Sequence, residues 1–361
     1  GYPHFMLKEI EEQPNVIEKT LEVYTNYDGK VDFSSFLKEL DLSKIEEIYI
    51  VACGTAYHAG LQGAYFFKKI SGIKTDVDIA SEFRYRDPLI TDKSLIISVS
   101  QSGETADTLA VLRAAKEVGA RTLAVTNVVG STISREADNV IYTMAGPEIA
   151  VASTKAYTTQ VVIMYALGLY FGELRGTLDK NIEDLIKEGL LQIPDKIQEL
   201  LENKEQFEEI AKLLKDEEDL FFLGRGIDYA LALEGSLKLK EVSYIHSEAY
   251  AGGELKHGTI ALIEPGTKVI ALLTQEKLRE KMVSNVVEVK ARGAYVIGLA
   301  YEGDQLDSSV FDKVITIPRV SNRVATIPAA VALQLLAYYT AKEKGCDIDK
   351  PRNLAKSVTV E

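Results

Sequence analysis

The segment Ser100-Gln101-Ser102-Gly103-Glu104-Thr105 combines three hydroxyl side chains with a glycine at the end of a predicted buried strand. A helix is expected to begin at Thr105, and the free N–H groups and positive dipole end of a helix start favour an anion. Gly103 would let the backbone come close to that anion. The segment therefore predicts a phosphate-binding loop, with the alternative that Ser102 is only a helix N-cap.

Three charged residues, Glu234, Lys238 and Glu241, follow one another at steps of four and three and therefore share a helix face. A solvated stripe of ion pairs is one interpretation. The other is a carboxylate base kept ionised and oriented by a lysine. Close by, His257 is a candidate acid or base, or simply one of the basic residues that end a short helix before Gly258.

Other reactive residues give weaker signals. Gly224-Arg225-Gly226 resembles the start of a dinucleotide-binding fingerprint, but Tyr229 stands at the third glycine position. Cys53 follows a predicted strand without a base nearby, which favours a packed thiol. Two cysteines and four scattered histidines offer no disulfide framework and no zinc ligand set.

Short β-branched runs alternate with segments of helical period from residue 47 onward, which is typical of parallel sheets with crossover helices. An N-terminal helix is expected over Met6–Val23, and Leu220–Leu223 is expected to be a strand. In the first half, the expected strands are Ile48–Ala52, Ser94–Ser100, Arg121–Thr126 and Val140–Tyr142, and the expected helices are Ala56–Lys69, Thr105–Val118 and Thr154–Leu174.

The two halves of the chain repeat one another. A shift of 172 places Gly54 on Gly226, and a shift of 174 places Gln101 on Gln275, with the two extra residues near Pro265. An internal duplication is predicted, and Thr274-Gln275-Glu276-Lys277 then matches the phosphate loop without its glycine. If a phosphate binds, we expect it in the first copy.

The predicted domains are an N-terminal helical segment (1–40), a first copy (41–175), a helical linker (176–216), a second copy (217–346) and a tail (347–361). The tail is expected to dock and close the active site. This expectation rests on the apolar residues Leu354, Ala355, Val358 and Val360.

Composition excludes several classes of function. With 41 Lys and Arg against 54 Asp and Glu, the net charge of −13 disfavours nucleic-acid binding. The longest apolar run, Val161–Phe171, is too short to span a membrane. We expect a cytoplasmic protein, and the start at Gly1 without a signal peptide suggests a piece of a longer chain.

Five segments together carry a resemblance to a known family: Ser100–Thr105, Val151–Lys155, Leu237–His246, Glu254–Gly258 and Pro351–Glu361. Over essentially all 361 residues, the sequence resembles the isomerase part of the glutamine:fructose-6-phosphate aminotransferases (glucosamine-6-phosphate synthases). The resemblance implies an α/β fold of two tandem sugar-isomerase (SIS) domains, each a mostly parallel sheet flanked by helices, with a C-terminal tail. One departure is Ala56, because many family members have serine there.

The resemblance also implies roles for individual residues. Glu241 would move a proton between C1 and C2 of the sugar, His257 would assist ring opening, and Lys356 would form an imine with the open ketose. Glu234 and Lys238 would support Glu241. The implied substrate-binding residues are Thr55, Ser100, Gln101, Ser102, Thr105, Val151, Ser153 and Ala355.

The implied substrate is a hexose 6-phosphate. Fructose 6-phosphate would give glucosamine 6-phosphate with ammonia and glucose 6-phosphate without it, with no metal or organic cofactor. The family implies a homodimer with a shared site, leaving open whether His257 serves its own subunit, and an N-terminal glutaminase domain that this sequence lacks. This chain is therefore not expected to hydrolyse glutamine.

Three alternatives remain. A fructosamine-6-phosphate deglycase or a free-standing SIS sugar isomerase would differ at residues 353–361. A non-catalytic sugar-phosphate sensor would not need Glu241, His257 and Lys356 together. A nucleotide-dependent oxidoreductase is disfavoured by Tyr229.

Overall fold

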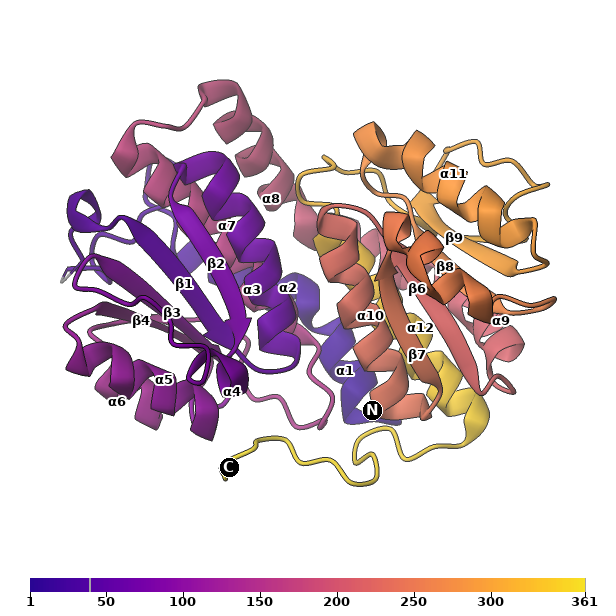
Figure 1. The fold of residues 1–361 in the computed structure, drawn as a ribbon, viewed down its shortest axis with the longest axis horizontal. Coiled ribbons are helices and arrows are strands. Elements are labelled where there is room, and N and C mark those ends of the chain that lie inside the picture. Colours follow the sequence, from indigo (N-terminus) through magenta and orange to yellow (C-terminus); the bar gives the residue numbers. More distant parts are fainter. Residues whose placement is uncertain (39, 361) are drawn as a thin grey trace. The chain divides into compact units, whose positions relative to one another are not determined.

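The computed structural model describes residues 1–38 and 40–360 and contains two five-stranded parallel sheets (Figure 1). This confirms the predicted α/β fold with two parallel sheets. The chain divides into two compact units. We call the unit of residues 15–148, 155–191 and 355–361 the first-copy unit, and that of residues 1–14, 149–154 and 192–354 the second-copy unit. The predicted domain boundaries stay predictions, since these units are composed of interleaved segments.

The first-copy unit holds a sheet of strand order β2-β1-β3-β4-β5. Its central strand β3 is buried along its whole length, as its run of apolar residues requires. Helices α4, α5 and α6 cover one face of the sheet, and α3 and α7 pack together on the other (Figure 1). The strands are β1 (Glu47–Ala52), β2 (Lys74–Ile79), β3 (Ser94–Ser100), β4 (Arg121–Thr126) and β5 (Asn139–Tyr142). The helices are α2 (Gln13–Val23), α3 (Thr55–Phe66), α4 (Ala80–Phe83), α5 (Ala106–Glu117), α6 (Thr132–Glu136) and α7 (Lys155–Arg175).

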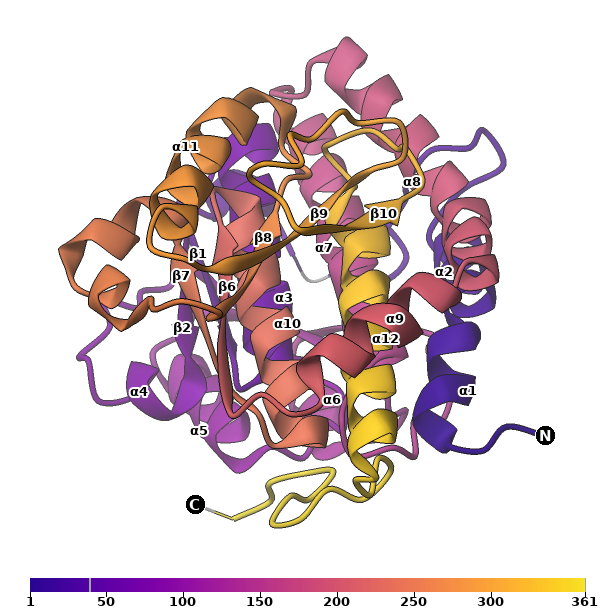
Figure 2. The same ribbon diagram turned by 90° about the vertical axis from the view of Figure 1, so that its right-hand side faces the viewer.

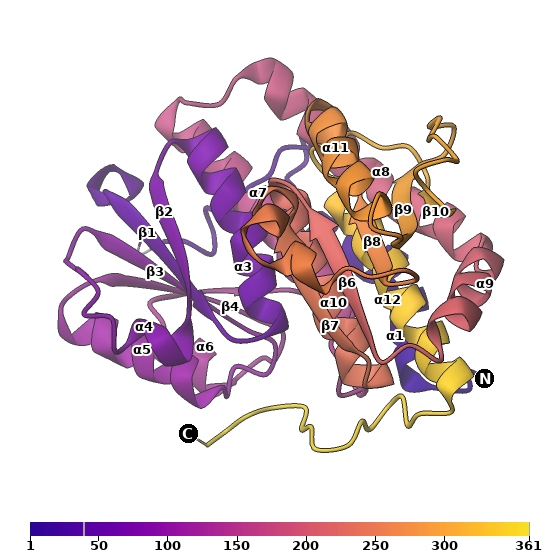
Figure 3. The same cartoon turned by 45° about the vertical axis from the view of Figure 1, so that its right-hand side comes forward.

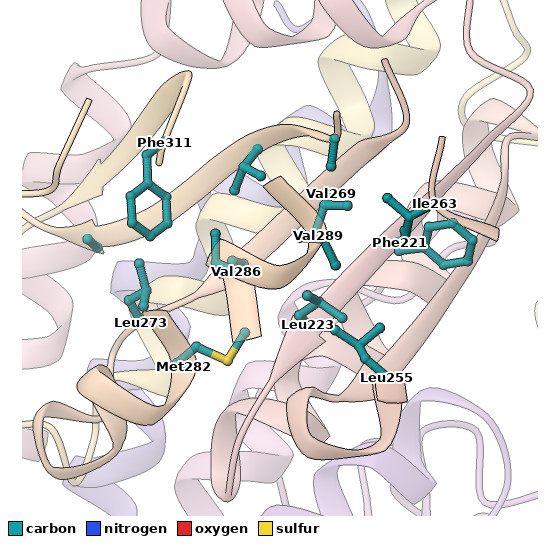
Figure 4. Close-up of a cluster of buried hydrophobic side chains, with 14 residues drawn as sticks. Phe221, Leu223, Leu255, Ile263, Val269, Leu273, Met282, Val286, Val289 and Phe311 are labelled. Carbon is teal, nitrogen blue, oxygen red and sulfur yellow. The ribbon is translucent and has the colours of Figure 1, made fainter. Parts of the chain in front are cut away.

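The second-copy unit repeats this plan with strand order β10-β9-β8-β6-β7. Helices α10 and α12 pack together along the sheet (Figures 2 and 3), and α11 covers an apolar cluster that includes Leu223, Val269 and Val286 (Figure 4). The strands are β6 (Asp219–Gly224), β7 (His246–Ala251), β8 (Lys268–Leu272), β9 (Tyr295–Tyr301) and β10 (Lys313–Ile317). The helices are α1 (Phe5–Glu11), α9 (Glu205–Leu214), α10 (Ile227–Ser243), α11 (Arg279–Lys290) and α12 (Thr326–Lys344). Helix α8 (Lys180–Glu202) contains the division between the units, and the region predicted as a linker folds as α8 and α9.

Equivalent ion pairs in the two units confirm the internal duplication. Lys116 lies 3.1 Å from Asp138, and Lys290 lies 2.6 Å from Asp312. Each aspartate also accepts a backbone N–H from the start of the neighbouring strand, at 2.9 Å for Asp138 and 2.7 Å for Asp312. Both pairs are related by the predicted shift of 174.

Strand register corrects the predicted position of the insertion. Val51 pairs with Ser98 in the first sheet, whereas Leu223 pairs with Ala271 in the second. The shift is therefore 173 at β3 and β8, so the two extra residues are not both near Pro265. One precedes β8, and the other lies between β8 and β9. Sequence matching cannot separate two single insertions when the loop residues between them differ.

Three expectations about secondary structure were wrong. The single helix over Met6–Val23 is broken at Glu12, because Pro14 lacks an N–H and its ring clashes with the preceding turn. Strands β2 and β7 were not predicted. Both are edge strands with mostly exposed or half-buried residues, so neither carries the apolar run that marks a central strand.

The tail forms no helix or strand over residues 346–360. Its apolar residues do not dock as expected, because Leu354 is 44% exposed, Val358 59% and Val360 73%. Ile348 and Pro351 are buried instead. The tail is otherwise held by polar contacts, several of which involve predicted site residues.

Candidate active site

The phosphate loop is a tight turn at the carboxyl end of β3. The Ser100 hydroxyl lies 2.9 Å from that of Thr105 and accepts the N–H of Gly103 at 3.0 Å. Gly103 has φ +66, and a Cβ there would lie 2.2 Å from Oγ of Ser131. Only glycine fits this position without strain. The loop therefore has the shape that an anion cradle at a helix start needs.

Ser102 is not the N-cap of α5, so the alternative interpretation of the loop is wrong. Thr105 holds the N-cap position and makes no side-chain capping bond. The Ser102 hydroxyl instead accepts the N–H of Glu104 at 3.2 Å. Glu104 itself turns away to Thr132, whose N–H and hydroxyl hold the pKa of this carboxyl below its usual value. The hydroxyls of Ser100, Ser102 and Thr105 thus do not cap the helix.

The end of the tail lies on this loop within the first-copy unit. The Ser357 hydroxyl is 3.0 Å from that of Ser102, and the carbonyl of Val358 accepts the N–H of Ala106 at 3.3 Å. Lys356 directly precedes these contacts, so its backbone is anchored next to the phosphate loop.

Lys356 forms an ion pair with Glu148, a residue that the sequence did not single out. Its Nζ lies 2.5 Å from Oε2 of Glu148, whose side chain is fully buried. The other carboxylate oxygen accepts the N–H of Ala156 at 3.1 Å in the first turn of α7, where the helix dipole favours a negative charge. A lone glutamate before the segment Val151–Lys155 carries no pattern that could have marked it.

The charged face of α10 is buried, so the solvated ion-pair stripe is wrong. The Lys238 side chain is 1% exposed and that of Glu234 is 2% exposed. Lys238 Nζ lies 3.6 Å from Glu234 and 2.5 Å from Glu241, whose side chain is 20% exposed. Lys238 therefore holds Glu241 with one carboxylate oxygen fixed and part of its side chain open to solvent, an arrangement suited to an oriented base.

Other predicted site residues lie on loops. His257 is exposed at the end of a 3-10 helix, Gly252–His257. Val151 and Ser153 are half-buried, and the N–H of Val151 donates to the carbonyl of Asp349 at 3.0 Å. Thr55 begins α3 at the carboxyl edge of the first sheet.

The structure thus assembles the predicted residues into two groups. The first-copy unit holds the phosphate loop, Thr55, Ala355 and Lys356. The second-copy unit holds Glu234, Lys238, Glu241, His257, Val151 and Ser153.

The weaker sequence signals have structural explanations. Arg225 Nε donates to Asn285 at 2.8 Å, and a Cβ on Gly224 would lie 2.3 Å from the carbonyl of Asp228. Gly224 therefore serves packing, and Gly226 allows the backbone its positive φ of 59. Burial raises the pKa of the Cys53 thiol, as expected for a packed residue.

Over residues 1–38 and 40–360, no group of three or more His, Cys, Asp or Glu could hold a metal ion, and no helix is long and apolar enough to cross a membrane. A cavity of about 600 Å³ opens beside β2 and is lined by residues such as Tyr49, Tyr65 and Arg86. It contains none of the predicted site residues.

Comparisons with known proteins agree with this geometry. The SIS domain model matches twice, at residues 41–170 and 213–342. The chain is 59% identical over its whole length to a glutamine–fructose-6-phosphate aminotransferase [isomerizing] from Clostridium tetani and 49% identical to one from Methanosarcina acetivorans. It spans about 60% of the length of these relatives.

Solved structures give the same result. The C-terminal domain of glucosamine-fructose-6-phosphate aminotransferase from Francisella tularensis is 39% identical, with a TM-score of 0.91 over 97% of this chain and 99% of that one. Tagatose-6-phosphate ketose/aldose isomerase from Escherichia coli shares the fold at 17% identity and a TM-score of 0.77. The chain therefore belongs to the SIS domain family and corresponds to the C-terminal isomerase part of the glutamine–fructose-6-phosphate aminotransferases.

Proposed function

We propose that this chain isomerises fructose 6-phosphate. With ammonia the product is glucosamine 6-phosphate, and without it the product is glucose 6-phosphate. The observation that carries the proposal is the tether of Lys356 to the phosphate loop through Ser357 and Ser102. A lysine whose backbone is anchored at an anion cradle can bring its amine to the carbonyl of a sugar whose phosphate is bound there.

The first-copy loop binds the phosphate in this proposal. Ser100, Ser102 and Thr105 donate hydroxyl hydrogen bonds, and the loop N–H groups, including that of Gln101, point to the anion. No lysine is needed to neutralise the phosphate, because the helix dipole and several hydrogen-bond donors stabilise its negative charge.

Lys356 supplies covalent catalysis. After His257 helps to open the sugar ring, the neutral amine of Lys356 attacks C2, and loss of one water gives an imine that makes the C1 proton more acidic. Ammonia, when present, replaces the lysine at C2. The side chain of Lys356, again protonated, then returns to its ion pair with Glu148.

Glu241 moves the proton. With ammonia, its carboxylate takes a proton from C1 of the ammonia-derived imine and returns it to C2, so that C1 becomes the aldehyde carbon and C2 carries the amine. Without ammonia, water first hydrolyses the lysine imine and frees Lys356, and the same proton transfer on the open ketose gives a C2 hydroxyl and glucose 6-phosphate. Lys238 keeps Glu241 oriented, and Glu234 balances the charge of the buried Lys238. Val151, Ser153, Thr55 and Ala355 complete sugar binding in this proposal.

Partners of the chain follow from the same proposal. A glutaminase domain would supply ammonia in the full-length protein, and two copies of the chain would form a homodimer with a shared site in the cytoplasm. Mixing subunits that carry Glu241→Gln with subunits that carry His257→Ala tests the shared site. Recovery of activity in the mixture shows that His257 acts across the dimer.

The decisive experiment is direct. The purified chain is incubated with fructose 6-phosphate and ammonium chloride, and the glucosamine 6-phosphate formed is measured. Product formation that is lost in Lys356→Ala supports the proposal. Binding of the sugar phosphate without turnover would instead identify a sensor, and release of ammonia from a fructosamine phosphate would identify a deglycase.

A further inference from the structure

The loop of the second copy already holds an anion, and that anion is the chain's own Asp228. This carboxylate is buried, with the residue 1% exposed. It accepts the N–H of Thr274 at 2.9 Å and the Thr274 hydroxyl at 2.5 Å, and it also accepts the N–H of Gln275. A buried carboxylate is stable only with such donors. The donors are those of the loop at the end of β8.

The first copy has an alanine at the equivalent place. Asp228 is the second residue of α10, and Ala56 is the second residue of α3, 172 positions earlier. The residues before the two helices share one unusual backbone shape, with φ 57 and ψ −130 at Gly54 and φ 59 and ψ −130 at Gly226. The side chain at residue 56 therefore leaves its helix in the same direction as that of Asp228.

The receiving loops are equivalent as well. The register of β3 and β8 puts Thr274 at the place of Gln101. The N–H groups that Asp228 binds are thus the counterparts of the N–H groups of Gln101 and Ser102. A carboxylate and a phosphate can both bind such N–H groups, because each offers negatively charged oxygen atoms as acceptors.

We propose that Asp228 is a built-in occupant of the second copy's anion cradle, and that Ala56 keeps the first cradle open. This pair of residues decides which copy takes the substrate's phosphate. The inference rests on the proposed function in one respect, since it assumes that hexose 6-phosphates bind the first-copy loop.

The test transfers the carboxylate to the first copy. In the full chain, Ala56→Asp should weaken the binding of fructose 6-phosphate and of inorganic phosphate by about a hundredfold, because the new carboxylate competes for charge-assisted hydrogen bonds and repels the ligand. Isothermal titration calorimetry measures both affinities. Ala56→Ser is the matched control and should bind within about threefold of the parent, since a hydroxyl adds no charge.

A second variant tests the cradle of the second copy without relying on the sugar. Asp228→Ala leaves the buried donors without an acceptor and should lower the melting temperature. Sodium formate, whose carboxylate replaces the lost one, should restore part of that loss beyond the effect of equal sodium chloride. Asp312→Ala is the control, because its partners Lys290 and Val296 lie at a more open site, and formate should not rescue it.

The outcomes separate the two proposals. Parent-like phosphate affinity in a folded Ala56→Asp overturns the inference about Ala56 and Asp228, and so does the lack of formate rescue in Asp228→Ala. If the parent chain binds no sugar phosphate while formate still rescues Asp228→Ala, the proposed function fails and the occupied second cradle stands.

Discussion

Lys356 and Glu148 are 208 residues apart in sequence, yet their charged groups lie 2.5 Å from each other. Glu148 is fully buried, whereas Lys356 is 26% exposed. Loss of the ion pair should therefore cost more free energy at the buried carboxylate than at the partly exposed lysine. Removal of Lys356 would take one charged partner from this buried carboxylate.

Lys356→Ala should abolish borohydride trapping of fructose 6-phosphate, because no amine remains to form the imine. It should also lower the free energy of unfolding by about 2 kcal/mol, since the buried carboxylate of Glu148 loses one charged hydrogen-bond partner. Urea titration measures the second effect. The double variant Lys356→Ala/Glu148→Gln is the control and should regain most of the stability without regaining trapping. Stability that is equally low in the double variant would contradict this account of the ion pair.

Glu241→Gln should separate imine formation from proton transfer. The amide keeps the shape of the carboxylate but cannot take a proton, so trapping by Lys356 should persist. Exchange of the C1 proton with deuterium in the solvent, followed by NMR, should fall by about a thousandfold. Exchange at the parent rate would show that another group moves the proton.

Asp228→Asn should stabilise the protein in a pH-dependent way. Burial raises the pKa of Asp228 to about 6. The folded state therefore binds this proton more tightly than the unfolded chain, whose aspartate titrates near 4. The charged form costs stability above pH 6, by roughly 3 kcal/mol, and the cost disappears as the pH falls from 6 to 4.

The gain in melting temperature from Asp228→Asn should thus be large at pH 7.5 and small at pH 4.5. Asp307→Asn is the control, because its exposed carboxylate has a lowered pKa that comes from hydrogen bonds with Ser309. That substitution should not stabilise the protein at either pH. An equal gain from Asp228→Asn at both pH values would show that the charge is not the cause.

Gly103→Ala should damage the phosphate loop. A side chain at φ +66 is strained, and its Cβ would collide with Ser131. We expect a stability loss of about 2 kcal/mol and weaker binding of inorganic phosphate. Gly130→Ala is the matched control, because Gly130 has φ +74 with nothing within 4 Å of an added Cβ. It should cost about 1 kcal/mol and leave phosphate binding unchanged.

Residues whose role depends on local pattern could be predicted from the sequence. The buried strand β3, the hydroxyl-rich turn after it and the charged spacing on α10 are all properties of a few neighbouring residues. Glu148 and Asp228 could not be found this way. Each acts through contacts with residues that are distant in sequence, such as Lys356 for Glu148 and Thr274 for Asp228, and single acidic residues have no periodicity or spacing.

The edge strands show a second limit of prediction from the sequence. Strand β2 has the sequence Lys-Thr-Asp-Val-Asp-Ile, in which charged residues alternate with uncharged β-branched ones. It is defined by its pairing with β1, not by its own hydrophobicity. Similarly, the apolar residues of the tail suggested burial, but hydrogen bonds and an ion pair hold its end in place.

The two compact units interleave along the chain, so neither can be produced as one continuous fragment. Its polypeptide passes from one unit to the other five times, after residues 14, 148, 154, 191 and 354. No single cut can release either unit with all of its own segments. A fragment that ends at residue 175 would keep residues 149–154 but lose residues 192–354, which form most of the same unit. Expression of separate halves should therefore give insoluble or mutually dependent fragments, which recover a native fold only when both are synthesised together.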